Sequence, residues 1–140
     1  MSEIRGGKMA IARLMTNICS HDLAASRDFY RDLLGLKVNY DSDWFIQLGF
    51  PDNAHLELGI LQQGHPLMPA EFYAAPQGCY LTFVVDDVDA VYARAQSMNL
   101  SLLQAPKDEF YGQCRMLLTD PNGVFLDISS PIADYQPSQV

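Results

Sequence analysis

The chain has 140 residues and a formal net charge of −8, from 9 Lys and Arg against 17 Asp and Glu. This length corresponds to about one domain, and 49% hydrophobic with 19% charged residues is typical of a globular rather than a disordered protein. The acidic charge argues against a nucleic-acid partner, and no apolar run approaches the roughly 20 residues that cross a bilayer, so we expect a soluble protein without a membrane partner.

The ends of the chain and its cysteines give the first expectations about organisation. Residues 1–9 are polar and lack the apolar region of a signal peptide. We therefore expect a flexible tail at 1–9 and a C-terminal tail at 133–140, on either side of a single domain at 10–132. Three cysteines without metal-ligand spacing, Cys19, Cys79 and Cys114, favour a reducing, cytoplasmic location.

The first half of the expected domain begins with an apolar strand at residues 13–19. Asp22 follows and can cap the free N–H groups at the start of a helix. Apolar residues then recur with helical period, at Leu23, Phe29, Tyr30, Leu33 and Leu34. After Gly35 come three strand-like runs, at residues 37–40, 44–50 and 55–61.

The second half repeats this order. A strand at residues 79–85 precedes Asp87, which is the equivalent capping residue. The helix that follows carries one apolar face, made of Val88, Val91, Ala95 and Met98. Three more strand-like runs come after it, at residues 100–104, 114–119 and 124–129.

Matching turns support an internal duplication. Phe50-Pro51-Asp52-Asn53 takes the place in the first half that Asp120-Pro121-Asn122-Gly123 takes in the second, and both are turn sequences. The helix starts are 65 residues apart and the last strands 70, so we place five extra residues in the loop at 107–113. The sequence therefore predicts an α+β domain of two βαβββ modules, at residues 11–61 and 78–131, with a linker at 62–77.

Two motifs carry a family resemblance. With D-L-A-A-S-R-D-F-Y-R-D-L-L-G-L at 22–36 and D-P-N-G at 120–123, the sequence resembles the vicinal oxygen chelate superfamily, which includes glyoxalase I, extradiol dioxygenases and the fosfomycin- and bleomycin-resistance proteins. The resemblance implies that the two modules form a cupped mixed sheet, with the helices on the convex side and a small-molecule ligand on the concave side. It also implies a homodimer.

The resemblance further implies a metal position at the first and last strand of each module. In this sequence those four positions hold Met15, Glu57, Tyr80 and Asp127. A thioether and a neutral phenol are poor ligands for hard or borderline divalent ions. We therefore expect no standard metal centre and no cofactor, although Glu57 and Asp127 alone leave a weakly bound divalent metal possible.

The alternation of side chains along strands predicts which residues face the cup. The apolar set that includes Leu14, Trp44 and Leu56 is assigned to the helix side, together with Thr16. The cup face combines large apolar groups with a few polar ones, as small-molecule pockets do. The expected ligand-binding residues are Met15, Asn17, Phe45, Gln47, His55, Glu57, Tyr80, Thr82, Tyr111, Arg115 and Asp127.

Several of these roles stay open at this point. Glu57 or Asp127 is the catalytic base if the protein is an enzyme, whereas the structural alternative is that one of them pairs with Arg115. Tyr111 belongs either to a lid over the cup or to a loop anchored by its aromatic residues.

Three functions compete. The first is a metal-independent protein that binds a small aromatic or cationic molecule, as bleomycin-resistance-like members do; the acidic charge and the aromatic residues favour it. The second is a lyase, isomerase or dioxygenase with a divergent divalent-metal site, or an enzyme that uses one of the two carboxylates as base. The third is a scaffold that has lost catalysis and serves as an interaction or regulatory module.

Overall fold

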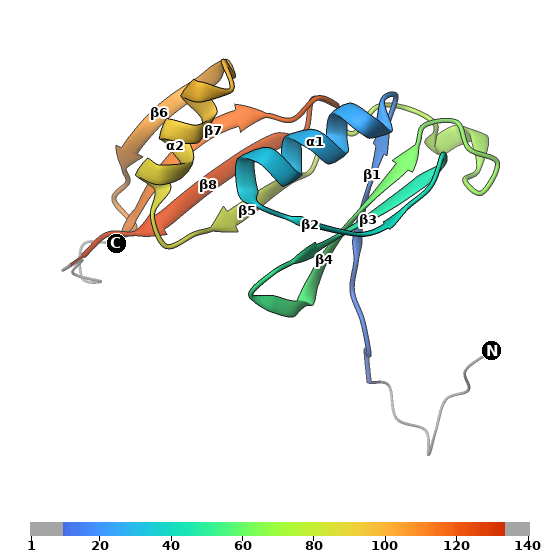
Figure 1. Cartoon of the computed structure of the whole chain (residues 1–140), viewed down its shortest axis with the longest axis horizontal. Coiled ribbons are helices and arrows are strands. Elements are labelled where there is room, and N and C mark those ends of the chain that lie inside the picture. Colours follow the sequence, from blue (N-terminus) through green and yellow to red (C-terminus); the bar gives the residue numbers. More distant parts are fainter. Residues whose placement is uncertain (1–9, 134–140) are drawn as a thin grey trace.

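A computed structural model describes residues 10–133 of the chain. Its elements follow one another in two similar series of a strand, a helix and three strands (Figure 1). They are β1 (Thr16–Ser20), α1 (Leu23–Leu34), β2 (Lys37–Asp41), β3 (Phe45–Phe50), β4 (Asn53–Gln62), β5 (Tyr80–Val84), α2 (Val88–Ser97), β6 (Leu102–Asp108), β7 (Gln113–Thr119) and β8 (Phe125–Pro131), with a short 3₁₀ helix (Ala70–Phe72) before β5.

The strands form two four-stranded mixed sheets of identical topology. The order is β1-β4-β3-β2 in the first sheet and β5-β8-β7-β6 in the second. In each sheet the first strand runs parallel to the last, and the other neighbours are antiparallel. The predicted α+β fold of two βαβββ modules is therefore confirmed. Part of the predicted loop at 107–113 is strand, because β6 continues to Asp108.

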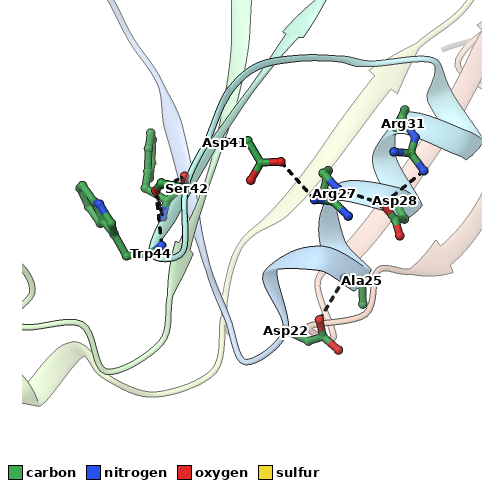
Figure 2. A network of polar contacts seen from close by, with 9 residues as sticks. Asp22, Ala25, Arg27, Asp28, Arg31, Asp41, Ser42 and Trp44 are labelled. Atoms are coloured by element: carbon green, nitrogen blue, oxygen red, sulfur yellow. Dashed lines mark hydrogen bonds and ion pairs between the residues drawn. The ribbon is translucent and has the colours of Figure 1, made fainter.

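Both helices begin at the predicted aspartates. The side chain of Asp22 accepts a hydrogen bond from the Ala25 N–H (Figure 2), and Asp87 accepts from the N–H groups of the two residues that follow Val88. Helix α1 ends at Gly35, whose φ of 71° lies in the left-handed region that favours glycine. These caps satisfy backbone groups that the ends of a helix leave without partners.

One face of each sheet packs against the helices and forms a single core. Alternate strand residues and the inner faces of both helices contribute to it, and α1 and α2 lie next to each other (Figure 1). The fully buried members include Tyr30, Leu33, Ile46, Leu48, Ile60, Met116, Leu118, Leu126 and Ile128. The opposite face of each sheet, turned away from the helices, is called the open face below.

A buried polar network joins the two modules. Tyr30 on α1 donates from its hydroxyl to Oδ2 of Asp120 at 2.6 Å, in the turn between β7 and β8. Nearby, Asn122 Nδ2 donates to Ser26 Oγ at 3.0 Å. All four side chains are buried, so the network fixes the second-module turn against the first-module helix.

Four residues predicted to pack against the helices are not buried there. Leu14 is 84% exposed, because β1 begins only at Thr16, which is itself exposed, and the chain before β1 extends away from the body of the molecule (Figure 1). Leu56 has the same strand parity as buried Leu58 but is 49% exposed, in a pocket that Leu34 at the end of α1 also lines. Trp44 precedes β3 rather than belonging to it, so strand alternation does not apply to it.

The predicted tail at residues 1–9 and all but the first residue of the tail at 133–140 lie outside the described residues. Within residues 10–133, no helix is long and apolar enough to cross a membrane.

Candidate functional site

The open face of the first sheet carries an apolar pocket of about 490 Å³. It lies where β1, β3 and the end of β4 meet the linker between the modules. We call it the aromatic pocket, and its lining residues are Met15, Asn17, Cys19, Trp44, Phe45, Leu61, Leu67 and Met68. Met15, Asn17 and Phe45 are among the predicted ligand-binding residues, and the structure brings these three together.

A short turn before β3 places the indole of Trp44 in this pocket. Ser42 Oγ accepts from the Phe45 N–H at 3.0 Å and donates to the Phe45 carbonyl at 2.8 Å (Figure 2). Trp44 therefore leaves the strand direction, and its ring stacks on His65 of the linker with centroids 4.6 Å apart. The prediction that Trp44 faces the helices is wrong for this reason, and the residue belongs to the candidate site.

The linker closes the far wall of the aromatic pocket. Met68 lies against Cys19, whose Sγ is 3.4 Å from the thioether sulfur. Burial raises the pKa of the Cys19 thiol, so the thiol stays protonated and acts as an apolar wall rather than as a nucleophile. Leu67 and Met68 were not among the predicted site residues, because no periodicity marks which linker side chains fold back on a sheet.

Gly59 on β4 allows the pocket wall to form. A Cβ atom at this position would lie 2.0 Å from Asn17 Oδ1 and 3.0 Å from Cε1 of Phe45. Because glycine has no side chain, Asn17 and Phe45 can approach each other across the strand between them.

A bidentate ion pair lies farther along the same open face. Arg13 donates through Nε to Oε2 and through Nη2 to Oε1 of Glu57, the latter at 2.6 Å, and Gln47 Nε2 also donates to Oε1 at 2.6 Å. The Arg13 guanidinium holds the pKa of the Glu57 carboxyl below its usual range. We call Arg13, Gln47 and Glu57 the Glu57 cluster. Arg13 was not predicted, although it has the same strand parity as Met15.

The second module carries a separate polar cluster. Arg115 Nη1 lies 3.6 Å from Oδ2 of Asp127 and donates to the Tyr111 hydroxyl at 3.0 Å, and Thr82 Oγ1 lies 3.5 Å from the same carboxylate oxygen. The structural pairing of Asp127 with Arg115 is therefore present. Tyr111 is tied to Arg115, which agrees with an anchored loop rather than an open lid.

The remaining two predicted residues lie at the margins of these groups, since His55 lines a groove with Arg13 and Glu57, and Tyr80 lines a small pocket with Asn17. His55 is exposed at the start of β4, in an open groove between that strand and the chain before β1. Tyr80 on β5 is 57% exposed and packs edge-on against Phe125 with centroids 5.1 Å apart. The structure thus distributes the eleven predicted residues over the aromatic pocket, the Glu57 cluster, the polar cluster around Asp127 in the second module and these two marginal positions.

The four positions that the resemblance assigns to metal ligands do not fit a standard divalent centre. Met15 offers a thioether that lies 3.7 Å from Arg13 Nη2, and Tyr80 offers a phenol. Both oxygens of Glu57 accept from Arg13 in the first module, and Asp127 pairs with Arg115 in the second. Within residues 10–133, no three or more His, Cys, Asp and Glu side chains are arranged to hold a metal ion. Divalent ions prefer oxygen and imidazole ligands that are free to coordinate.

Comparison with known proteins places this arrangement in a wider group. The Bacillus subtilis (strain 168) protein YwbC is 29% identical in an alignment of 94 positions that covers 63% of this chain and 71% of YwbC. A crystal structure of a glyoxalase/bleomycin resistance protein/dioxygenase family enzyme from Burkholderia phytofirmans PsJN has a TM-score of 0.71 at 24% identity, covering 84% of this chain and 97% of that one. Lactoylglutathione lyase from Agrobacterium tumefaciens has a TM-score of 0.67 at 18% identity, covering 88% and 96%.

At these identities the two crystal structures establish a common fold and no common reaction. The sequence itself goes further, since the model of one family matches residues 11–128, which span both modules and the linker. The duplicated fold and this match agree, and the chain belongs to the glyoxalase/bleomycin resistance protein/dioxygenase superfamily.

Proposed function

We propose that this protein binds a small aromatic or cationic molecule on its open face, without the standard metal centre of the superfamily. The aromatic pocket is the observation that carries the proposal. It combines the rings of Trp44 and Phe45 with the thioethers of Met15 and Met68, and its volume of about 490 Å³ suits a small organic ligand.

The chemistry of the wall favours a flat ring. Trp44 and Phe45 lie with ring centroids 5.5 Å apart and planes tilted by 36°, so a ligand ring has two aromatic surfaces to contact. Met side chains adapt to irregular ring shapes and contact aromatic groups favourably. A cation is also suited to the faces of aromatic rings, and the net charge of −8 favours cations over anions at long range.

Trp44 provides a direct test, because it is the only tryptophan in the chain. A panel of neutral, cationic and anionic aromatic compounds is titrated while the intrinsic fluorescence is followed, and each hit is measured by calorimetry. We expect saturable quenching by neutral or cationic members, and Trp44→Ala to weaken their binding at least tenfold. Phe72→Ala is the matched control, since Phe72 is an exposed aromatic residue outside the pocket.

Two results would overturn this proposal. One is the absence of saturable binding by any neutral or cationic aromatic compound in calorimetry. The other is a stoichiometric, tightly held divalent metal in protein purified without chelators, since the proposed binding needs no such ion.

Asp127 favours a second candidate, an enzyme of the lyase or isomerase type. Its side chain is buried, and Oδ1 has no hydrogen-bond partner among residues 10–133. A buried carboxylate oxygen without a partner is a feature of catalytic sites, and a substrate group that reaches it would find a proton acceptor. Turnover of a compound that binds the wild type, lost in Asp127→Asn while binding persists, would identify this activity.

We also propose a homodimer in the cytoplasm. Tyr80 and Val84 on β5 are 57% and 65% exposed, and a second chain would remove these apolar surfaces from water. Cys19, Cys79 and Cys114 are free thiols, as a reducing compartment maintains them. Light scattering coupled to gel filtration gives the mass of the assembly, and a monomer at micromolar concentration would contradict the homodimer. Cell fractionation gives the location of the protein, and an extracellular pool would contradict the cytoplasmic location.

A further inference from the structure

The two side chains of the Arg13–Glu57 ion pair differ strongly in their exposure to solvent. The Glu57 side chain is only 12% exposed, whereas the side chain of Arg13 is 60% exposed. Gln47 fixes Oε1 of the carboxylate from the neighbouring strand, independently of the arginine. The acceptor is therefore built into the sheet, and the guanidinium approaches it from outside.

Arg13 belongs to a segment that is not part of the sheet. The β1–β4 register begins with Thr16 opposite Leu58, so residues 10–15 precede the paired strand. Ile11 and Leu14 on either side of Arg13 are 86% and 84% exposed. An open groove of about 510 Å³ separates this segment from the start of β4. The guanidinium contact with Glu57 is thus an attachment by one exposed side chain.

The acceptor lies next to the aromatic pocket. Gln47 and Phe45 are two residues apart on the same face of β3, which corresponds to about 7 Å along a strand. Met15 connects the two places, because it lines the aromatic pocket and its Sδ lies 3.7 Å from Arg13 Nη2. A ligand that spans the aromatic pocket and the Glu57 carboxylate needs an aromatic ring with a planar cation directly beside it.

We propose that Glu57 and Gln47 form a subsite for a guanidinium or amidinium group, and that Arg13 occupies this subsite in the absence of ligand. The two carboxylate oxygens suit the fork of N–H donors that such groups present. This inference rests on the proposed function, because it assigns the ligand's ring to the aromatic pocket and its cationic group to Glu57 and Gln47. The ligand class is an aryl amidine or aryl guanidine.

Arg13 then acts as an internal competitor. The apparent dissociation constant of the ligand rises by the inverse of the fraction of molecules in which Glu57 is free. If Arg13 holds Glu57 for most of the time, its removal strengthens amidinium binding by roughly three- to tenfold.

The probe is benzamidine, with benzamide as its neutral counterpart of the same shape. Calorimetry gives both dissociation constants for the wild type, Arg13→Ala, Arg13→Met, Glu57→Gln and the double variant of Arg13→Ala with Glu57→Gln. We expect both Arg13 variants to bind benzamidine three- to tenfold more tightly with benzamide unchanged, and Glu57→Gln combined with Arg13→Ala to lose this gain. Arg31→Ala is the matched control, because Arg31 is an exposed arginine on α1 that pairs with Asp32 and with Asp28; Figure 2 shows the pair with Asp28.

The failure of this inference differs from that of the proposed function. If benzamide binds in a manner that depends on Trp44 but both Arg13 variants bind benzamidine no more tightly than the wild type, the internal competitor is refuted and the aromatic pocket stands. If neither compound binds, methylguanidinium is titrated into the Arg13→Ala variant, because this cation has no ring and does not need the aromatic pocket. A shift of the Gln47 side-chain NMR signals that Glu57→Gln abolishes would support the subsite, and no shift would overturn it.

Discussion

Removal of the Tyr30 hydroxyl tests whether the network between the modules stabilises the fold. Tyr30 is fully buried and donates to Asp120 at 2.6 Å, a bond between a neutral donor and a carboxylate. In Tyr30→Phe the ring stays in the core, and Asp120 Oδ2 keeps only the longer contact with Asn122 Nδ2 at 3.3 Å. The variant therefore isolates one hydrogen bond.

The expected loss follows from the charge and burial of this bond. Hydrogen bonds to charged groups contribute about 1.5–3 kcal/mol, so we expect the free energy of unfolding to fall by about 2 kcal/mol. An unfolding entropy of about 2.1 cal/mol/K per residue gives ~0.3 kcal/mol/K for this chain. The melting temperature should then fall by about 7 °C.

Urea unfolding followed by circular dichroism measures the change in free energy, and calorimetry measures the melting temperature. Tyr92→Phe is the control, since the Tyr92 hydroxyl only accepts from Gln96 at the surface of α2. We expect the control to stay within about 0.5 kcal/mol of the wild type. A Tyr30→Phe variant that is equally close to the wild type would refute the reasoning.

Four further predictions concern pH and local geometry. Burial and Asp120 raise the pKa of Tyr30 above its unfolded value of about 10. The stability that the neutral hydroxyl contributes is therefore complete below about pH 10 and is lost as the pH rises beyond it, so Tyr30→Phe should lose less stability than the wild type in alkaline unfolding titrations. Arg13 lowers the pKa of Glu57, so the ionised carboxylate stabilises the fold above the unfolded pKa of 4.5, and this stabilisation is lost as the pH falls through the lower native pKa. The difference in melting temperature between the wild type and Glu57→Gln should therefore shrink from about pH 6 to about pH 3, and a constant difference would contradict this. Asp22→Ala removes the cap of α1 and should cost about 1 kcal/mol in urea unfolding, whereas Asp22→Asn, which can still cap, should cost less than half of that. Gly59→Ala should displace the ends of the Asn17 and Phe45 side chains, which its Cβ would meet, and so weaken the binding of ring compounds in calorimetry; an unchanged affinity would mean that these side chains move without altering the pocket.

The sequence predicts the fold well because its signals are local and repeated. The capping aspartates Asp22 and Asp87 mark both helix starts, and both are N-caps in the structure. Alternation places Ile46 and Leu48 in the core, and their register partners on β4, Ile60 and Leu58, are buried as well. Strand ends are less well predicted; β1, for example, begins at Thr16 rather than at residue 13.

The candidate site is predicted only in part, because several of its members lie outside regular strands. Trp44 precedes β3, and a turn at Ser42 decides its direction, which alternation cannot give. Met68 reaches the pocket through a linker whose path depends on tertiary contacts. Arg13 pairs with Glu57 across 44 residues of sequence, and no local pattern indicates such a partner.

The polar network between the modules also distinguishes one half of the duplication from the other. By the offsets of the repeat, Ala95 on the second-module helix is the counterpart of Tyr30, and Phe50 in the first-module turn is the counterpart of Asp120. The equivalent pair of residues is therefore apolar. Two copies of the first half placed together would set the Tyr30 hydroxyl against Phe50, and a buried donor without an acceptor costs about 1–3 kcal/mol. The halves have become complementary rather than interchangeable, and half-chains produced separately should associate first half with second half in preference to either with itself.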